Sequence, residues 1–474
     1  MSPSAAALQE PDGQVVVEAL VRRARAAMAA FASADQALVD DAVRALAWSL
    51  YQPEHARALA ELAVADTGLG NVADKIAKNQ RKTFGTLRDL LRVRTVGVIE
   101  EDTARGVVKY AKPVGVVGAL TPSTNPAATP VNKAMMAIKG RNAVVIAPSP
   151  AGWTTTARAV DFMRAGLAGM GLPADLVQVV PQPLNRARTQ ALMRAVDLIV
   201  CTGSQTNVRE AYRSGTPAIG VGAGNVPVIV DESADLADAA ARIARSKCFD
   251  NATSCSSENA LVLLEEIYAE AIAALGQEGG YLCSAAERAR LEAALFEGGR
   301  LSRALVAKDA AVIAARVGLR DEAEHARFFM VEETGIGQGH PFSGEKLSLV
   351  LAVYRARDFA HAKELCRAIL DYQGRGHSVG IHTRRPERAQ ALAAELDVVR
   401  VLVNQAHTFG NGGGFDNGLP FTLSMGCGTW AGNSISENLN WRQFINVTHL
   451  VTTIAEDRPT EEALFGPYWQ RYGR

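Results

Sequence analysis

The stretch VGVVGALTPSTN, residues 114–125, is an apolar run followed by a polar turn. An apolar run that contains several valines predicts a strand buried on both faces. Four similar runs follow at 142–147, 176–180, 197–201 and 226–230, and segments with helical periodicity separate them at 127–138, 154–168, 186–195 and 206–214. This alternation is typical of βαβ units, so the sequence predicts an α/β fold with a parallel sheet.

A parallel sheet also predicts where a ligand binds, because its ligands lie at the carboxyl ends of the strands. In this chain the strand ends carry small and polar residues. They read TPSTN (121–125), APSPAG (147–152), CTGSQTN (201–207) and GVGAGN (220–225). We therefore expect these turns to build a ligand site.

The remaining sequence predicts a helical beginning and a second α/β series. Apolar residues repeat at helical spacing in 15–31, 40–51, 54–66 and 72–92. After residue 255, strands are expected at 260–265, 347–353, 378–382 and 398–403, with helices between them. Two apolar segments, 108–110 and 443–453, can pair as an oligomerisation sheet or stand as ordinary edge strands.

The composition is that of an ordinary globular chain of 474 residues, with 48% apolar and 21% charged residues. Fifty basic and fifty acidic residues cancel, which removes any general attraction to nucleic acid or to an anionic membrane. No apolar run approaches the roughly 18 residues that span a bilayer. The N-terminus lacks a secretory pattern, and the six cysteines have no paired or metal-binding spacing. We expect a cytoplasmic protein with reduced thiols and no metal site.

Cys255 lies in FDNATSCSSEN (249–259), a polar segment between a helical run and an apolar strand. A turn in this place can present a side chain to a cleft. On this segment alone, the residue is either a nucleophile or an incidental thiol, because a thiol reacts well only when its pKa of about 8.5 is lowered. Glu258 is expected to order the turn, with a role as a base as the alternative.

The helix expected at 72–92 is rich in cations, namely Lys75, Lys78, Arg81, Lys82, Arg88 and Arg92. Such a run usually forms a solvated face. The alternative is that one of these side chains meets an anionic group of a substrate.

Five segments, taken in this order, resemble the aldehyde dehydrogenase superfamily and more narrowly its CoA-acylating branch. They are TPSTNP (121–126), GVGAGNVP (220–227), the Cys255 segment, GEKLSLVLAVY (344–354) and GCGTWAGNSISEN (426–438). The resemblance implies two doubly wound parallel-sheet domains and a small oligomerisation arm. Its domains would be 1–98 with 114–228 for the dinucleotide, 229–432 for catalysis, and 99–113 with 433–474 for the arm and tail.

The resemblance implies that Cys255 attacks the aldehyde and that Asn125 donates its side-chain amide to the resulting oxyanion. One such donor is commonly worth about 10²–10³ in rate. Taken alone, Asn125 also fits as a turn former before Pro126. Hydride transfer to NAD or NADP would then leave an acyl thioester on Cys255.

Position 221 bears on how that thioester is released. Hydrolytic members of the superfamily carry a glutamate in an E-L-G-G segment, where this chain has Val221. A general base typically contributes about 10²–10⁴ in rate, so its loss would let the thioester survive until CoA takes the acyl group. We therefore expect CoA as a co-substrate.

By the same resemblance, the cofactor-binding residues are Thr121, Pro148, Ser149, Thr202, Gly203, Ser204, Gly222 and Glu345. The turn at 202–205 would offer a helix N-terminus to pyrophosphate, although it lacks a full G-x-G-x-x-G. Glu345 would hold a ribose, although Leu349 stands where the family has proline. Since APSPAG has no acidic residue for the ribose 2′-OH, NAD and NADP both stay open.

Other candidate residues are expected to be structural. Cys201 ends a buried strand, and Cys427 lies between two glycines. For His340 and His407, the alternative to a structural role is CoA deprotonation or contact with an anionic substrate. The glycine-rich loop 410–414 is expected to be a lid or a wall, since no Lys-Ser/Thr pair follows it.

Three C-terminal segments resemble acylating sulfoacetaldehyde and succinate-semialdehyde dehydrogenases: NQAH (404–407), NGLPFTLSMGCGTW (417–430) and FGPYWQRYG (465–473). We expect oxidation of sulfoacetaldehyde to sulfoacetyl-CoA, with succinate semialdehyde or a short aldehyde such as acetaldehyde or propionaldehyde as alternatives. The competing classes are a non-catalytic microcompartment cargo subunit and a reductase that acts on an acyl phosphate. The expected partners are the aldehyde, CoA and further copies of the chain in a homodimer or homotetramer, with no nucleic acid or membrane. The expected location is the cytoplasm or the interior of a bacterial microcompartment.

Overall fold

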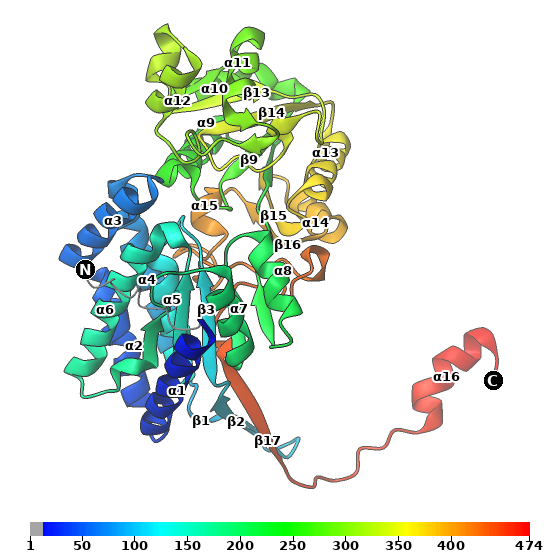
Figure 1. Ribbon diagram of the computed structural model, residues 1–474. Helices are drawn as coiled ribbons and strands as arrows, with labels where there is room; N and C mark the ends of the chain where they lie inside the picture. The colour runs from blue at the N-terminus through cyan, green and yellow to red at the C-terminus, as the bar shows by residue number, and fades with distance from the viewer. Residues whose placement is uncertain (1–12) are drawn as a thin grey trace, which may run out of the picture.

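The computed structural model describes residues 13–474 and shows two α/β lobes with a projecting arm (Figure 1). The N-terminal helices and β3 lie in the first lobe, and β9 and β14 lie in the second lobe, at the top of the figure. The C-terminus lies at the end of the arm, away from both lobes. The N-terminal segment without a secretory pattern falls largely in residues 1–12, which lie outside the described residues.

The first lobe is built on a five-stranded parallel sheet with the order β5-β4-β3-β6-β7. Its apolar runs fill a core of their own, in which Val116, Val145 and Ile199 are completely buried. The strands are β3 (Val116–Thr121), β4 (Ala143–Pro148), β5 (Val177–Val179), β6 (Leu198–Cys201) and β7 (Ala218–Gly220). The sequence predicted four of these strands and missed β7, which has only three residues.

Helices cover the sheet of the first lobe, as expected for βαβ units. They are α1 (Gly13–Phe31), α2 (Gln36–Tyr51), α3 (Pro53–Thr67), α4 (Val72–Leu91), α5 (Ala128–Lys139), α6 (Trp153–Gly169), α7 (Arg186–Ala195) and α8 (Gln205–Arg213). Side-chain caps define several of the starts: Asp35 begins α2, Asn71 begins α4 and Ser204 begins α8. All eight helices were predicted from the apolar periodicity, with ends that shift by a few residues.

The second lobe contains a seven-stranded parallel sheet with the order β10-β13-β14-β9-β8-β15-β16. Its strands are β8 (Val226–Val230), β9 (Glu258–Leu264), β10 (Gly280–Leu282), β13 (Phe328–Glu332), β14 (Val350–Ala356), β15 (Gly376–His382) and β16 (Val398–Val403). A β-hairpin, β11 (Phe296–Glu297) with β12 (Arg300–Leu301), adjoins it. The helices are α9 (Leu236–Cys248), α10 (Tyr268–Gln277), α11 (Ala285–Leu295), α12 (Ala310–Val317), α13 (Phe359–Tyr372), α14 (Pro386–Glu395) and α15 (His407–Gly410). Together the two lobes confirm the predicted pair of parallel-sheet domains.

One strand lies in a different sheet from the one we expected. Residues 226–230 were predicted to close the first series, but β8 pairs with β9 and β15 in the second lobe. The expected boundary at 228/229 therefore falls inside β8. An apolar run of this kind fits either buried sheet, and only long-range pairing decides between them.

The arm begins with a three-stranded antiparallel sheet, in the order β1-β2-β17. These strands are β1 (Gly97–Asp102), β2 (Val107–Pro113) and β17 (Ile445–Val451), and Tyr110 of β2 faces Thr448 of β17. The predicted pairing of 108–110 with 443–453 is confirmed. Beyond β17 the chain runs to α16 (Glu461–Tyr472), a helix that the sequence analysis did not predict and that contains Pro467.

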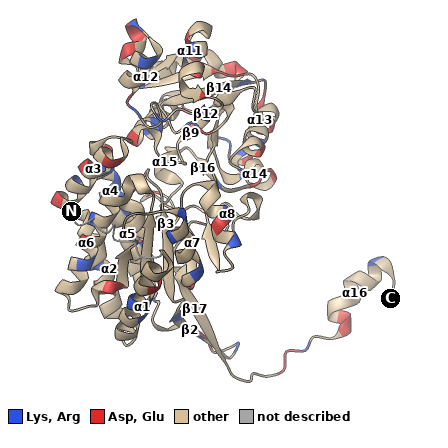
Figure 2. Cartoon of the chain, viewed as in Figure 1, with Lys and Arg blue, Asp and Glu red and all other residues tan. Residues whose placement is uncertain are grey.

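Charges of both signs are mixed on the face of residues 13–474 that Figure 2 shows. Basic and acidic side chains alternate over the helices of both lobes in Figure 2, in keeping with 50 charges of each sign. Among residues 13–474, no helix combines the length and apolar character that a membrane span requires.

Candidate active site

A cleft of about 790 Å³ opens where the carboxyl ends of β3, β4 and β6 meet the loop that carries Cys255. All ten residues predicted for the site line this cleft. They are Cys255, Asn125, Thr121, Pro148, Ser149, Thr202, Gly203, Ser204, Gly222 and Glu345. The turns at the strand ends therefore come together as expected for a parallel sheet.

The Cys255 loop begins with an unusual backbone. Between α9 and β9, three consecutive residues adopt positive φ angles: Asp250 (50°), Asn251 (52°) and Ala252 (59°). Left-handed conformations cost energy for residues with a side chain, so surrounding contacts must hold them. This run turns the chain before Cys255, which is half-buried and lines the cleft.

Two donors are available around the thiol for an oxyanion. Within residues 13–474, the backbone N–H of Cys255 donates no hydrogen bond to protein. The Asn125 side chain, at the end of β3, lines the same cleft. A main-chain N–H and a side-chain amide that face a reacting carbon form the usual pair of donors for a tetrahedral intermediate.

The thiol of Cys255 rests in its protonated form. Burial raises the pKa of Cys255 to about 12, and the charges of Glu345 and Cys427 raise it further. Arg400 and a hydrogen bond from Ser256 act in the opposite direction but do not outweigh burial.

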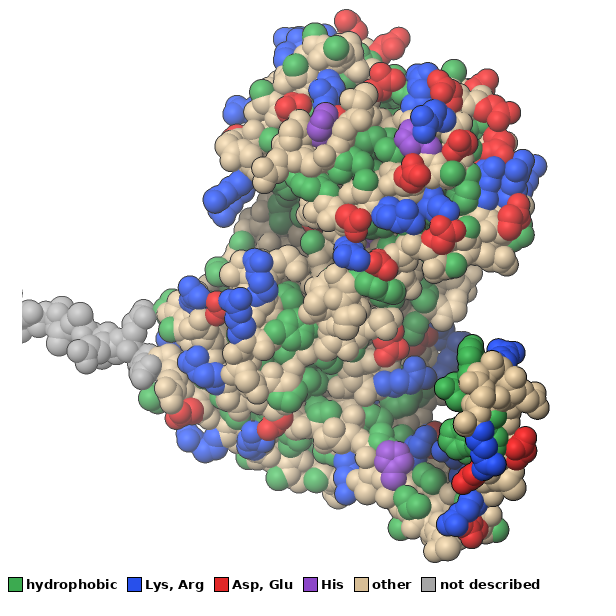
Figure 3. Space-filling view, turned by 90° about the vertical axis from the view of Figure 1, so that its right-hand side faces the viewer, with side chains coloured by type: hydrophobic (Ala, Val, Ile, Leu, Met, Phe, Trp, Pro, Cys, Tyr) green, Lys and Arg blue, Asp and Glu red, His purple; other side chains and the backbone are tan. Residues whose placement is uncertain are grey.

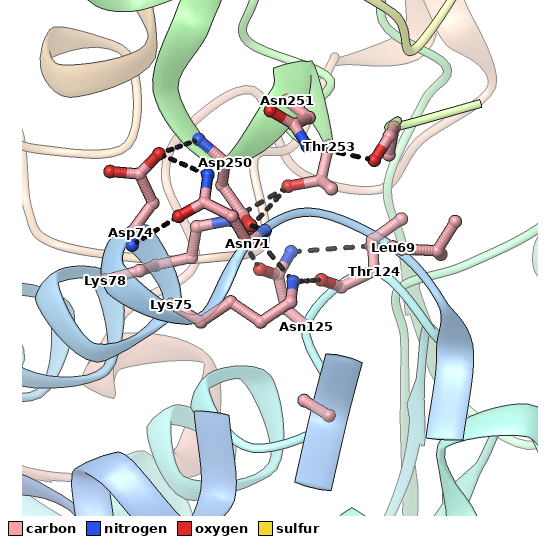
Figure 4. A network of polar contacts seen from close by, with 12 residues as sticks. Leu69, Asn71, Asp74, Lys75, Lys78, Thr124, Asn125, Asp250, Asn251 and Thr253 are labelled. Atoms are coloured by element: carbon pink, nitrogen blue, oxygen red, sulfur yellow. Dashed lines mark hydrogen bonds and ion pairs between the residues drawn. The ribbon is translucent and has the colours of Figure 1, made fainter. Parts of the chain in front are cut away.

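A lysine fixes the orientation of the Asn125 amide. Lys78 Nζ donates to Asn125 Oδ1 at 2.9 Å and to Thr253 Oγ1 at 2.9 Å, as Figure 4 shows. An ammonium group has donors only, so its partner must be the amide oxygen. The Nδ2 group of Asn125 is then left with one long contact, 3.4 Å to Thr124 Oγ1. It is available to donate into the cleft.

Asp250 holds this arrangement in place through both lysines (Figure 4). Its carboxylate forms ion pairs with Lys78 and, at 3.0 Å, with Lys75, and it accepts the backbone N–H of Asn71 at 3.0 Å. Both lysines and the aspartate are nearly completely buried. A Cβ on Gly70 would lie 1.8 Å from Asp250 Oδ1, so only glycine lets α4 approach the cysteine loop this closely.

The solvated-face interpretation of helix α4 is wrong for three of its cations. Lys75, Lys78 and Lys82 are 4%, 6% and 8% exposed and point into the protein. Their spacing of three and four residues places them on one face of the helix, which is the signal that could have identified them. Arg92 alone of the six cations is exposed, and Arg81 and Arg88 are half-buried.

The segment with Val221 packs directly against the nucleophile loop. A Cβ on Gly224 would lie 2.2 Å from the Cys255 carbonyl oxygen, so the two segments touch through glycine. Val221 lines the cleft and is 7% exposed. Among the residues that line the cleft, the only carboxylates are Glu210 and Glu345. The wall at position 221 therefore offers no base.

The other end of the cleft fits a dinucleotide. Ser204 caps α8 by accepting the N–H of Asn207 at 3.2 Å, and the start of this helix faces the cleft. A helix N-terminus favours phosphate oxygens. Thr202, before it, shares a hydrogen bond of 2.6 Å with Ser424. The residues present thus suit a pyrophosphate.

Glu345 also suits the expected ribose contact. Its backbone N–H donates to Gln373 Oε1 at 3.0 Å. Among the described residues, no protein group donates a hydrogen bond to its carboxylate, which lines the cleft. Burial raises the pKa of this carboxyl to about 8. A half-buried carboxylate without a hydrogen-bond partner is destabilised, and a ligand with hydroxyl donors would relieve this cost.

Glu258 orders the loop, as expected. It accepts hydrogen bonds from Ser246 Oγ at 2.6 Å and from the His407 N–H at 3.1 Å, and Lys247 donates to its backbone oxygen at 2.8 Å. Burial raises the pKa of Glu258 to about 7 and lowers the pKa of Lys247 to about 8. The side chain does not line the cleft.

The remaining histidines and cysteines have the structural environments that we expected. His407 is buried, its Nδ1 lies 3.0 Å from the Ser256 carbonyl oxygen, and burial lowers its pKa to about 3. His340 pairs with Glu333 at 2.8 Å. Cys201 and Cys427 are buried, and burial raises the pKa of both thiols.

A second, smaller cavity adjoins the cleft and was not predicted. It has a volume of about 30 Å³ and shares Asn125, Ser254, Leu423 and Met425 with the cleft. Side chains of α4 form one of its walls. The site therefore has two compartments on either side of the oxyanion donors.

Comparison with known proteins agrees with this geometry. Residues 8–281 match the aldehyde dehydrogenase family. A sulfoacetaldehyde dehydrogenase (acylating) of Cupriavidus necator is 56% identical over 97% of this chain and 93% of its own length. A succinate-semialdehyde dehydrogenase (acetylating) of Clostridium kluyveri is 35% identical over 96% of this chain and 99% of its own length.

A solved structure shares the whole architecture. The acetylating aldehyde dehydrogenase from Geobacillus thermoglucosidasius superposes with a TM-score of 0.91 at 35% identity, over 96% of this chain and 100% of that one. The family match covers more than half of the chain, and both relatives match almost all of it. On this evidence the chain belongs to the aldehyde dehydrogenase family.

Proposed function

We propose that this chain oxidises sulfoacetaldehyde to sulfoacetyl-CoA, with NAD or NADP as the hydride acceptor and CoA as the acyl acceptor. The observation that carries the proposal is the cleft in which Cys255 lies beside an oriented Asn125 amide while position 221 has no carboxylate. The acylating sulfoacetaldehyde dehydrogenase that is 56% identical supports the substrate.

In the first step, the Cys255 thiol loses its proton to solvent, its sulfur bonds to the aldehyde carbon, and the carbonyl oxygen becomes an oxyanion. The Nδ2 group of Asn125 and the N–H of Cys255 donate to that oxygen, and Lys78 keeps the amide in the required orientation. Such preorganised donors stabilise charge that develops only in the transition state.

The bound dinucleotide supplies the acceptor for the hydride that leaves the former aldehyde carbon. The C–O double bond re-forms, and an acyl thioester remains on Cys255. The start of α8 and the Glu345 carboxylate would hold the phosphate and ribose groups at the other end of the cleft. With no acidic side chain in the 147–152 turn, both NAD and NADP can be accommodated.

In the last step, the CoA thiol attacks the thioester, and the Cys255 sulfur leaves. Water competes poorly because Val221 cannot deprotonate it. The balance is one aldehyde, one CoA thiol and one oxidised dinucleotide consumed, and one acyl-CoA, one reduced dinucleotide and one proton released.

Mass spectrometry of the intact protein and of its proteolytic peptides tests for the acyl-enzyme directly. The protein is incubated with sulfoacetaldehyde and oxidised dinucleotide in the absence of CoA. A sulfoacetyl adduct on the Cys255 peptide that disappears when CoA is added is the expected result. An adduct on another cysteine, or one that CoA does not remove, would contradict the proposal.

Succinate semialdehyde is the second candidate, favoured by the 35% identical relative that spans nearly the whole chain. Both substrates carry an anionic group, so they differ in the length between that group and the aldehyde. Initial rates with both aldehydes at equal concentration would rank them.

We also infer that copies of this chain associate through the arm. The strand β17 and its continuation expose Leu450, Val451 and Ile454, which are 51%, 66% and 47% accessible, and Figure 3 shows apolar side chains on the surface of the projecting arm. A contiguous patch of exposed apolar side chains on a protein surface usually marks an interface. Sedimentation of the intact chain tests this, and a monomer at micromolar concentration would contradict it.

A further inference from the structure

The small cavity beside the cleft is lined by three cations of one helix. Lys78, Arg81 and Lys82 of α4 reach it, and so does Asn125, the oxyanion donor. Ser254 and Ser256, the neighbours of Cys255, form the opposite side. A group that occupies this cavity would therefore lie next to the carbon that Cys255 attacks.

Two of these cations form no ion pair within residues 13–474, namely Arg81 and Lys82. Lys78 shares the carboxylate of Asp250 with Lys75, and the charge of Asp416 acts on Arg81 without a direct ion pair. Lys82 donates to the Gly412 carbonyl oxygen at 2.7 Å, and Arg81 donates to the Phe409 carbonyl oxygen at 3.1 Å. Burying an uncompensated charge is costly, and here the buried ammonium group of Lys82 lies next in sequence to the half-buried guanidinium of Arg81.

Burial changes the pKa of Lys82. Its pKa is lowered to about 7, first by desolvation and then by the charges of Arg81 and Lys78. The Arg81 guanidinium lies over the rings of Phe409, Phe415 and Phe421 at 5.1, 5.8 and 5.2 Å, and aromatic faces compensate a cation only in part. An anion between the two side chains would relieve this cost.

A neutral donor in the same cavity also lacks a partner. Thr408 lines the cavity and is 7% exposed, and its Oγ1 has no hydrogen-bond partner among the described residues. Buried hydroxyl groups in proteins are nearly always paired. The cavity thus combines two positive charges with an unsatisfied hydroxyl.

We propose that this cavity is the subsite for the sulfonate group of the substrate, with Arg81, Lys82 and Thr408 as its specificity-determining residues. The inference rests on the proposed function and extends it to the residues that recognise the anion. Three donors suit the three oxygens of a sulfonate, and charge-assisted hydrogen bonds hold such groups strongly.

Substitutions with a matched control test the proposal. Arg81→Gln, Lys82→Met and Thr408→Val each remove one donor. Arg88→Gln is the control, because Arg88 lies on the same helix and over the same rings, Phe415 and Phe421, but is paired with Asp89 and does not line the cavity. The readout is kcat/KM for sulfoacetaldehyde divided by kcat/KM for acetaldehyde, which lacks the anion.

The two charge-removing variants should lower this ratio by about 10–100-fold and Thr408→Val by about 3–10-fold, since bonds to charged groups contribute more than neutral ones. Arg88→Gln should change it less than twofold. A ratio that stays constant while both kcat/KM values fall would mean that these residues only support the fold, and would overturn the proposal.

A binding measurement separates this proposal from the proposed function. The probe is 2-hydroxyethanesulfonate, which has the carbon chain of the substrate but no aldehyde, and ethanol is the uncharged control. The sulfonate should slow alkylation of Cys255 in the unaltered protein at least fivefold and lose this effect in Arg81→Gln.

The two proposals then fail in different ways. Protection by the sulfonate without turnover of sulfoacetaldehyde would support the subsite and contradict the proposed function. Turnover of sulfoacetaldehyde without protection, and with an unchanged ratio in the variants, would support the function and overturn the subsite.

Discussion

Lys78 Nζ lies 2.9 Å from Asn125 Oδ1, and this contact sets which end of the amide faces the cleft. The lysine belongs to α4 and the asparagine to the turn that follows β3, so the oxyanion donor depends on an element that is remote in sequence. The pair also joins the small cavity to the larger cleft, because Asn125 lines both. Orientation of the donor and recognition of the substrate anion thus come from one helix.

Replacement of Lys78 by methionine should lower kcat and kcat/KM together by about 10–100-fold, because a misoriented Asn125 loses much of its contribution to the transition state. Steady-state kinetics with saturating cofactor and CoA measures the effect. The matched control is Lys75→Met, which breaks an ion pair with the same Asp250 but leaves the Asn125 contact intact. It should lose several-fold less activity, and equal losses in the two variants would argue against an orienting role.

Alkylation of Cys255 should depend steeply on pH in the free protein. Since burial raises the pKa of the thiol to about 12, the reactive thiolate fraction should rise about tenfold for each pH unit between pH 7 and 10. Iodoacetamide labelling, followed by mass spectrometry of the Cys255 peptide, gives the rate. The Cys255→Ala variant identifies labelling elsewhere. A plateau below pH 9 would show that the thiol ionises more readily than its surroundings imply.

Substitution of Gly224 by alanine should displace the nucleophile loop, because the new Cβ would lie 2.2 Å from the Cys255 carbonyl oxygen. We expect kcat to fall more than 100-fold while the protein remains folded, as followed by circular dichroism. Gly169→Ala is the control, since no atom lies within 4 Å of its added Cβ. Its activity should stay within twofold. Full activity of Gly224→Ala would mean that the loops do not need this close approach.

Introduction of a carboxylate at position 221 should divert the thioester to water. Val221 lines the cleft beside the cysteine loop, so Val221→Glu places a base where none exists. The rate of dinucleotide reduction in the absence of CoA should rise at least tenfold, within the usual range for a general base. Val221→Gln has nearly the same shape without a base and should show no such gain. A gain with both variants would point to a change in shape rather than to base catalysis.

Much of the site followed from the sequence because parallel strands bring their carboxyl ends together. The turns at Thr121, Pro148 and Thr202 were each predicted to end a strand, and all three line the cleft. The left-handed run before Cys255 was not predicted, because neither aspartate, asparagine nor alanine at that place requires it. It depends on contacts from α4.

The small second cavity could not be predicted from the sequence for a related reason. The cations of α4 have the composition of a solvated helix. The spacing of Lys75, Lys78 and Lys82 places them on one face, but only contacts with Asp250 and Phe421 show that this face is buried. Similarly, the apolar run of β8 fits either sheet, and only its pairing with β9 and β15 assigns it to the second lobe. Local sequence patterns predicted the helices and strands. Long-range contacts determined which sheet a strand joins and which helix face is buried.

The dependence of turnover on CoA is the most direct test of the central claim. The initial rate of dinucleotide reduction is measured with sulfoacetaldehyde, with and without CoA. The enzyme concentration is kept low enough that sustained turnover can be distinguished from a single turnover. The account predicts sustained turnover only with CoA, and without it a burst no larger than the amount of Cys255. Equal sustained rates in both conditions would contradict it, because water would then reach the thioester with the help of a base that position 221 does not supply.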